Sequence, residues 1–411
     1  MNLLKQITAI IGLLLFVQIG YSQNTDIHGY VRNYTGSLTD DGGDFSIVQN
    51  TLNLDIEKTG MDMGFKANPY VYHYTNQELE YGLREAYIDL YFKSMDIRLG
   101  KQQIIWGKAD GVFITDVVSP KNLREFLLPE FEEIRMGITS AKIDYYMGNN
   151  TFELVWVPEF VPTQLPDKES IWFPEQFPEF ANVDRSEKDV NPSIENSEVF
   201  FKYSRLSANF DLELMTGYMW DDDPAMHKEP FMNPQTGMLD SLAIHPKHHR
   251  IAMGGGSFST DLGGIVLRGE GAFYHDKYFA LNSFSDPDGM IKKDYAHYLV
   301  GFDFDIAGAK ISTQFIQEAI FNYENALQQE EFTNTMTFLA KDEFLRDKLT
   351  LEFFMYYGFE NSDALIRPTA TYEVARGVNL ITGANLFTGT EGRFGQYNKN
   401  DMVYFKLRYD F

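Results

Sequence analysis

The last nine residues of the chain alternate strictly between apolar and polar side chains. Val403, Phe405, Leu407, Tyr409 and Phe411 fall on one face of an extended segment, whereas three of the four residues between them are charged. A period of two residues is that of a β-strand. An apolar face opposite a charged face suits the wall of a membrane barrel, which meets lipid outside and water inside. A strand of a soluble sandwich can show the same alternation, so the pattern needs support from the rest of the chain.

The same two-faced pattern recurs in the segments 47–57, 82–93 and 294–306. Turn-forming residues divide the whole chain into predicted strands near 26–36, 45–58, 61–73, 82–93, 95–106, 136–147, 150–159, 197–206, 208–220, 248–259, 263–275, 293–306, 309–323, 331–342, 348–358, 364–375, 377–388 and 401–411. We therefore predict an all-β protein, a transmembrane antiparallel up-and-down β-barrel of about 18 strands, within a range of about 16 to 18. It should have long extracellular loops, of which one or more fold inward.

The connections between these strands alternate between short and long. The short connections include Thr59-Gly60 and Gly148-Asn149. The longer ones are 37–44, 74–81, 107–135, 160–196, 221–247, 276–292 and 389–400. Outer-membrane barrels have short periplasmic turns and longer extracellular loops. The alternation therefore predicts a cell outer-membrane location with both termini periplasmic, and a barrel of this width can hold a channel.

The first 22 residues have the layout of a secretory signal peptide. Lys5 precedes an apolar run over 7–19 that is short for a membrane span, and Ser22 ends a small-residue cleavage site. We expect 1–22 to be removed and 23–411 to form a single barrel domain, with an uncleaved anchor helix as the alternative. The chain has no cysteine, which excludes lipid attachment at cysteine and disulfide bonds.

Composition narrows the expected partners. The chain has 24 Tyr and 34 Phe against only 4 Trp, and barrels use aromatic residues in their interface girdles. The net charge of -24 argues against nucleic-acid binding. It suits a surface that meets divalent cations, outer-membrane lipid and lipopolysaccharide, although a soluble acidic protein would look the same. The terminal Phe411 resembles the signal that the barrel-assembly machinery binds, so that machinery is a further expected partner.

The most distinctive stretch lies after the fifth predicted strand. It reads Arg98-Leu99-Gly100-Lys101-Gln102-Gln103, then Trp106-Gly107, Asp116-Val117-Val118-Ser119-Pro120 and Arg124-Glu125. This order resembles a family of proteobacterial-type outer-membrane barrels known only as a domain of unknown function, over residues 95–162. Through Arg98 to Gln102 alone, it is more distantly similar to the alginate-export porins. The first resemblance implies an outer-membrane channel for hydrophobic molecules. Such channels are often associated with resistance-nodulation-division-type transporters, so the resemblance also implies an inner-membrane or periplasmic transport partner.

The segment 107–135 is too long for a surface turn and mixes charged with apolar side chains. Because charges inside a barrel need partners, we expect ion pairs with charges on the wall to hold this loop inward. These wall charges are Glu85, Asp89, Arg98 and Asp144. There it would form a constriction that selects the substrate, or alternatively a plug without a selective role. The residues assigned to the barrel interior and the constriction are Glu85, Asp89, Arg98, Gln102, Trp106, Lys108, Asp110, Asp116, Arg124, Glu125, Glu130, Glu133 and Arg135.

The loop 160–196 carries five aromatic residues on an acidic, proline-stiffened background: Phe160, Trp172, Phe173, Phe177 and Phe180. Exposed aromatic side chains there would capture an apolar or sugar ligand. Alternatively, the same side chains would form a hydrophobic lid packed on the barrel rim. The sequence does not choose between these two interpretations.

Two polar clusters are not expected to bind a metal ion. The run Asp221-Asp222-Asp223 lacks the alternating oxygen spacing of a calcium loop and is predicted to be a solvated turn. His245, His248 and His249 have no carboxylate partner beside them in sequence. We therefore predict no metal and no cofactor.

Catalysis is not predicted, and no catalytic residue is assigned. The sequence has no Gly-x-Ser-x-Gly elbow, no His-Glu-x-x-His, no P-loop and no cysteine nucleophile. The predicted function is an outer-membrane, porin-like channel that passes a small or hydrophobic substrate. The alternatives are a non-conducting receptor, adhesin or scaffold barrel, and a barrel hydrolase whose catalytic groups lie far apart in sequence.

Overall fold

The structure is a computed structural model that describes residues 25–40, 43–74, 79–174, 181–183, 190–233, 235–237, 239–282 and 288–411. The signal peptide predicted at 1–22 lies outside the described residues. Within the described ranges, no helix is long and apolar enough to cross a membrane.

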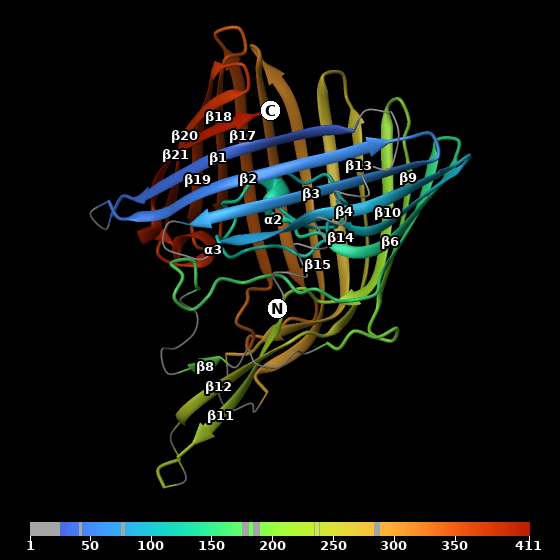
Figure 1. Ribbon diagram of the computed structural model, residues 1–411. Coiled ribbons are helices and arrows are strands. Elements are labelled where there is room, and N and C mark those ends of the chain that lie inside the picture. Colours follow the sequence, from blue (N-terminus) through green and yellow to red (C-terminus); the bar gives the residue numbers. More distant parts are fainter. Residues whose placement is uncertain are drawn as a thin grey trace.

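Eighteen antiparallel strands form one closed barrel (Figure 1). In barrel order they are β1 (Asp26–Leu38), β2 (Phe45–Thr59), β3 (Met63–Tyr74), β4 (Glu80–Phe92), β5 (Met95–Gln102), β6 (Ile138–Met147), β7 (Asn150–Val157), β9 (Glu198–Arg205), β10 (Phe210–Trp220), β13 (Arg250–Asp261), β14 (Ile265–Ala280), β15 (Met290–Ile306), β16 (Ala309–Ile320), β17 (Phe332–Phe344), β18 (Leu349–Gly358), β19 (Asp363–Ala375), β20 (Val378–Thr388) and β21 (Met402–Asp410). The last strand pairs with the first and closes the barrel. The predicted fold class and the number of strands are confirmed.

The seam between β1 and β21 depends on a close backbone approach. The backbone groups of Gly29 and Phe411 exchange two hydrogen bonds of 3.0 Å. A Cβ atom on Gly29 would lie 2.4 Å from the carbonyl oxygen of Asn53 on β2. Glycine is therefore required where β1 is held between two strands.

The alternation seen in the sequence separates the two faces of the wall. On β2, Gln49, Thr51 and Asn53 face inward and are 1% to 5% exposed, whereas Leu52 faces outward and is 40% exposed. The apolar set of β21 also faces outward, with 41% to 50% exposure: Val403, Phe405, Leu407, Tyr409 and Phe411. An apolar outer face and a polar inner face are what a barrel needs in lipid.

Three strands lie outside the barrel and were not predicted from the sequence. They are β8 (Ala181–Val183), β11 (Ala225–Met232) and β12 (Leu239–Lys247), which form a small sheet in what were predicted to be loops. Figure 1 shows this sheet projecting from the end of the barrel that carries the long loops. Short helical turns also lie in the connections: α2 (Phe131–Ile134), α3 (Gly392–Gly395) and the 3-10 turn η1 (Asn398–Asn400).

The predicted strand 95–106 is too long. β5 ends at Gln102, because the chain leaves the wall at the next residue, where the Gln103 amide donates a hydrogen bond of 3.0 Å to Glu85. Trp106 therefore belongs to the connection between β5 and β6, not to the wall.

Candidate functional site in the barrel interior

The connection between β5 and β6, residues 103–137, folds into the barrel and is called the crossing loop here. It has two parts, a far lobe of residues 104–119 and a near lobe of residues 120–135. The two parts meet at a common base, where the Ser119 hydroxyl bonds to both the amide and the carbonyl of Ile104, at 2.8 and 3.1 Å. A buried ion pair of 2.6 Å between Asp116 and Arg135 joins the same base.

The far lobe reaches the opposite wall. Asp110 donates its amide to Gln314 Oε1 (3.0 Å) and accepts a hydrogen bond of 2.8 Å from Gln314 Nε2 at its carbonyl. Arg268 adds an ion pair of 2.6 Å to the Asp110 carboxylate. Gln314 lies on β16, and the pairings β5-β6-β7-β9-β10-β13-β14-β15-β16 place β16 eight strands from β5. Nine strands would be diametrically opposite in an eighteen-stranded barrel, so the far lobe spans the interior.

Glu270 on β14 makes the densest contact with the far lobe. Its carboxylate accepts hydrogen bonds from the Lys108 amide (2.6 Å), the Thr115 amide (2.9 Å) and the Thr115 hydroxyl (2.8 Å). A Cβ atom on Gly107, which has a φ of 82°, would lie 2.4 Å from this carboxylate. Glycine is therefore needed where the backbone passes over Glu270.

Tyrosine hydroxyls complete the attachment by binding carbonyl groups of the far lobe. Tyr274 donates to the Ile114 carbonyl and Tyr356 donates to the Gly111 carbonyl, each at 2.7 Å. The wall residues that hold the far lobe were not assigned to the site from the sequence. Period-two alternation along β14, β16 and β18 is the signal that could have marked them as inward-facing, but it does not say which loop they meet.

Trp106 fills the base of the far lobe. It is 2% exposed, its indole N–H donates a hydrogen bond of 2.6 Å to Glu153, and its ring packs edge-on against Phe200 at 6.0 Å between centroids. A buried indole needs such a partner for its N–H. Trp106 is thus a packing residue as well as one of the residues that line the interior.

The near lobe is held by a cluster of basic residues. Arg32 on β1, 2% exposed, forms an ion pair of 3.0 Å with Glu133 and one of 3.4 Å with Glu130. Lys406 and Arg408 on β21 lie 3.2 and 3.5 Å from Glu130. Burial alone raises the pKa of the Glu130 carboxyl, but the three cations outweigh burial and hold that pKa below its ordinary value. Glu130 is therefore an ion-paired carboxylate at neutral pH.

Arg124 and Glu125 are adjacent in sequence but bind different partners. Arg124 pairs with Glu80 at 2.9 Å. Glu125 accepts a longer hydrogen bond of 3.4 Å from the Tyr74 hydroxyl, and burial, followed by the charge of Glu133, raises the pKa of its carboxyl.

Several wall charges that were predicted to hold the crossing loop do not contact it. Asp89 pairs with Arg98 on the neighbouring strand at 2.7 Å, and Asp144 pairs with Lys142 at 2.8 Å. That expectation was wrong for these two residues, because an opposite charge lies closer than the loop does, on the neighbouring strand for Asp89 and on the same strand, β6, for Asp144. Gln102, which is fully buried, donates to the Ser140 carbonyl on β6.

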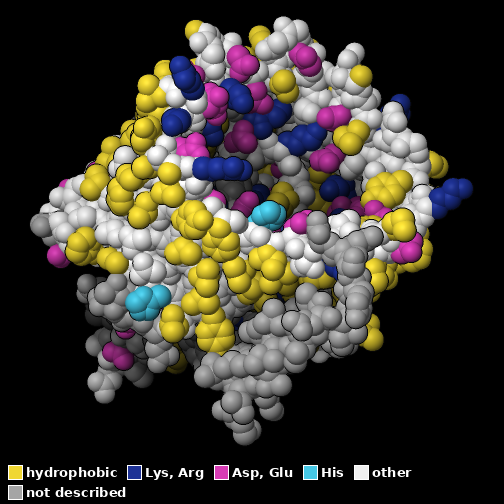
Figure 2. Space-filling model, turned by 45° about the horizontal axis from the view of Figure 1, so that its top comes forward, with side chains coloured by type: hydrophobic (Ala, Val, Ile, Leu, Met, Phe, Trp, Pro, Cys, Tyr) yellow, Lys and Arg dark blue, Asp and Glu magenta, His cyan; other side chains and the backbone are white. Residues whose placement is uncertain are grey.

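The inner face of the wall changes character along the barrel axis. Near the short turns it is charged or polar, as at Asp211, Glu213 and Asp303, and Figure 2 shows Lys, Arg, Asp and Glu side chains gathered in the hollow at this end. Toward the long loops the same strands carry buried apolar side chains: Val155, Val157, Phe200, Met215, Met219, Ile251, Met253, Leu299, Ile316 and Ile320. The far lobe lies at the boundary between these two regions. It is bound by Glu270 on the charged side and by Tyr274 on the apolar side, and only one inward position of β14 separates these two residues.

A cavity of about 280 Å³ opens beside the far lobe. It is lined by Ile105, Trp106, Gly107, Lys108, Ala109, Asp110, Val112, Asp116, Arg135 and Glu270. The cavity combines charges of both signs with apolar surface and is close to the lower size limit of small-molecule sites. Lys108 also reaches toward the short-turn end, where its ammonium group bonds to Ser259 at 3.0 Å.

The aromatic residues of the loop 160–196 pack on the protein rather than extend into solvent. Trp172 is 6% exposed and packs against Phe387 and Tyr397, each at 5.7 Å between centroids. Phe160 packs against Trp220, Phe173 is half-buried, and Phe177 lies outside the described residues. The expectation of an exposed aromatic side chain is wrong for Trp172, because the connection between β20 and β21 folds over it. This packing is that of the lid, the second of the two predicted alternatives.

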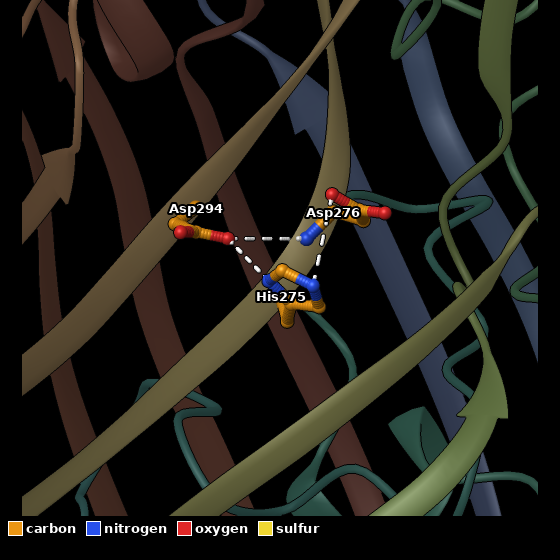
Figure 3. Close-up of side chains that lie close together, drawn as sticks. All are labelled: His275, Asp276 and Asp294. Carbon is orange, nitrogen blue, oxygen red and sulfur yellow. Dashed lines mark hydrogen bonds and ion pairs between the residues drawn. The ribbon is translucent and has the colours of Figure 1, made fainter.

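Polar clusters at the long-loop end also differ from expectation. Asp221 is largely buried and pairs with Lys277 at 2.6 Å, so it is not a solvated turn residue. A group the sequence analysis missed is shown in Figure 3, where His275, Asp276 and Asp294 converge at a bulge between β14 and β15. His275 and Asp276 are exposed and Asp294 is half-buried, and His275 Nδ1 already bonds to Asp294 at 2.6 Å. An ion-paired bulge explains this group without a metal ion.

An eighteen-stranded antiparallel barrel with a lipid-compatible outer face and a loop across its interior defines the class of porin-like barrels. Within that class, the chain belongs to the family DUF1302, described as a protein of unknown function, whose model matches residues 20–393. The family resemblance noted in the sequence is thereby confirmed. No curated protein matches the sequence.

Solved structures show the same fold at low sequence identity. Pseudomonas aeruginosa OccK8 (OprE) has a TM-score of 0.57 and 10% identity, over 95% of this chain and 98% of that one. Acinetobacter baumannii OccAB3 has a TM-score of 0.55 and 8% identity, over 94% and 99%. Pseudomonas aeruginosa OccK10 (OpdN) has a TM-score of 0.54 and 9% identity, over 95% and 99%. At these identities the likeness concerns the fold alone.

Proposed function

We propose that the protein is an outer-membrane channel in which the crossing loop forms the constriction. The observation that carries this proposal is the attachment of Asp110 to Gln314 and Arg268 on the wall opposite to the loop's origin. A loop held across the lumen narrows any path through it. The low-identity likeness to outer-membrane barrels supports a location in the outer membrane. We propose that the short turns and both chain ends face the periplasm, because outer-membrane barrels have short periplasmic turns and longer extracellular loops.

The interior supports a small substrate with both polar and apolar parts. A molecule moving along the axis would meet the charged short-turn half and the apolar long-loop half in succession, with the cavity beside the far lobe between them. The charges of Lys108, Asp110 and Arg135 would orient polar groups, while Ile105 and Val112 would contact an apolar body. This arrangement fits the small or hydrophobic substrate expected from the family.

Planar-bilayer conductance tests the proposal. The purified wild-type barrel should conduct ions weakly, and deletion of residues 109–132 should raise its conductance several-fold. Replacement of the cavity cation in Lys108→Glu should shift ion selectivity toward cations, because it reverses a charge at the constriction. Heat-modifiable gel mobility checks that each variant is a folded barrel. A folded deletion variant with the wild-type conductance would overturn the constriction.

A closed barrel is the second candidate, supported by the apolar cluster that surrounds Trp106 and Ile114. In that case the crossing loop is a plug, and the protein acts as a receptor or opens only with a transport partner. The same bilayer experiment separates the two functions. A plugged wild-type barrel conducts nothing while the deletion variant conducts, whereas a constricted channel conducts in both forms.

A further inference from the structure

Two histidine side chains at the long-loop end face each other, each through its own Nε2 atom. His227 lies on β11, which projects from the barrel, and His249 lies directly before β13 in the wall. Their Nε2 atoms are 2.7 Å apart. On the other side of its ring, His227 Nδ1 lies 2.5 Å from a carboxylate oxygen of Asp288, in the connection between β14 and β15. Three segments distant in sequence thus meet at one imidazole pair.

The contact with Asp288 decides which nitrogen of His227 faces its partner. A carboxylate accepts a hydrogen bond, so Nδ1 of His227 carries a proton and donates it to Asp288. Nε2 is then the atom that faces Nε2 of His249, and a single proton lies between the two nitrogens. A carboxylate bound to the outer nitrogen of a histidine is the usual way in which proteins orient an imidazole that binds a metal ion.

Both rings are held in place by neighbouring groups. The His249 ring packs against the Tyr278 ring of β14 with 3.9 Å between centroids and an angle of 31° between the planes. His227 has a side chain only 12% exposed, and its ring lies 5.5 Å from the same tyrosine. Little side-chain freedom therefore remains to be lost when a ligand binds between the rings.

We propose that His227 and His249 bind a divalent transition-metal ion such as Zn²⁺ through their Nε2 atoms, with Asp288 as the positioning residue. The metal takes the place of the shared proton, which is released on binding. Tetrahedral Zn²⁺ with Zn–N bonds of about 2.0 Å holds two nitrogens roughly 3.3 Å apart, so the rings must separate by about 0.6 Å. Water supplies the remaining ligands at this partly open site. The bound ion would clip the projecting β11 to the barrel rim.

This site differs from the histidines that the sequence singled out. His245 pairs with Glu229 on β11, and His248 bonds to the Asp221 carbonyl. Only His249 of that group belongs to the pair, and its partner, His227, lies 22 residues earlier in the chain. The proposed two-histidine site departs from the prediction that the chain binds no metal. The site is independent of whether the barrel conducts.

Titration of tag-free, detergent-solubilised full-length barrel with Zn²⁺ tests the proposal. Calorimetry should show one ion per chain, with proton release detected from the dependence of the heat on the buffer. His227→Ala and His249→Ala should each weaken binding at least tenfold, and Asp288→Asn should weaken it by about 10-fold to 100-fold through lost orientation. His275→Ala, in the exposed group of Figure 3, is the matched control and should leave the affinity unchanged.

Electron paramagnetic resonance of bound Cu²⁺ gives a second readout, since coupling to two imidazole nitrogens should be present in the wild type and reduced in either alanine variant. Gel mobility confirms that the variants remain folded barrels. Absence of Zn²⁺ binding, or equal binding by the wild type and both folded alanine variants, would show that the pair is only a hydrogen bond and would overturn the site. Equal weakening by His275→Ala would also overturn it.

Discussion

Replacement of Glu270 by glutamine tests whether the far lobe is held by the wall. The side chain keeps its size, but one of its two acceptor oxygens becomes an NH2 group that can only donate. In the structure, one oxygen accepts from the Lys108 amide and the other accepts from the Thr115 amide and hydroxyl. Glu270→Gln must therefore leave at least one amide of the far lobe without its acceptor and facing another donor.

The size of the effect follows from burial. Hydrogen bonds to a charged acceptor contribute about 1.5–3 kcal/mol each, and Glu270 is 5% exposed, so water cannot replace the lost acceptor in the attached state. We expect the attached far lobe to lose about 2 kcal/mol, which corresponds to a roughly 30-fold larger population of the detached lobe.

Amide hydrogen exchange measures this population directly. Exchange at Lys108 and Thr115 should accelerate by about the same roughly 30-fold factor, and single-channel recordings should show higher and noisier conductance. Glu213→Gln is the matched control, because Glu213 also faces inward but its hydrogen bonds come from the wall serines Ser204 and Ser257. Unchanged exchange at both far-lobe amides, or equal acceleration in the control, would refute the attachment by Glu270.

Three further predictions concern the near lobe, the lid and the seam. Because the pKa of Glu130 is held below its ordinary value, its ion pairs stabilise the near lobe above about pH 4.3 and are lost as the pH falls through the lowered pKa. The amide protection factors of residues 120–135, which compare the measured exchange rate with the intrinsic rate at the same pH, should therefore fall on acidification in the wild type and depend less on pH in Glu130→Gln; identical pH profiles of protection would contradict this. Trp172→Ala should destabilise the lid by about 3 kcal/mol and speed protease cleavage near this residue, whereas the half-buried Phe173→Ala should do so less; equal cleavage of the two variants would count against the lid. Removal of Phe411 should slow assembly by the barrel-assembly machinery, measured as the rate at which heat-modifiable barrel appears, because it takes away two seam hydrogen bonds as well as the terminal aromatic; an unchanged rate would exclude that role.

The wall of the barrel was predictable from the sequence because it follows a local rule. Each residue of β21 or β2 faces lipid or lumen according to its parity, and membrane and water impose opposite side-chain chemistry on the two faces. The pattern is readable within ten residues and needs no knowledge of the neighbouring strand. For the same reason, the strand ends were less well predicted: nothing local marks Gln102 as the last wall residue, since Gln103 leaves the wall to bind Glu85.

The partners inside the barrel could not be predicted, since they depend on which strands lie opposite one another. The inward position of Arg268 follows from alternation, but its contact with Asp110 joins residues 158 positions apart. The sheet of β8, β11 and β12 was missed for a related reason: its strands pair across two different loops, and β8 has only three residues. The pairing of His227 with His249 was invisible because it depends on that sheet.

The way in which the far lobe is attached determines which loop side chains can vary without releasing the loop. The wall side chains bind mainly backbone groups of the loop: the amides of Lys108, Asp110 and Thr115, and the carbonyls of Gly111 and Ile114. Backbone groups are present whatever the side chain, so most loop side chains can be replaced without losing these bonds. The exceptions are Gly107, whose conformation and close approach to Glu270 exclude other residues, the side chains of Asp110 and Thr115, which bind Arg268 and Glu270, and the Asp116–Arg135 pair at the base. In the proposed constriction, the cavity-lining side chains at 105, 108 and 112 are therefore the positions where selectivity can vary while the loop stays across the barrel.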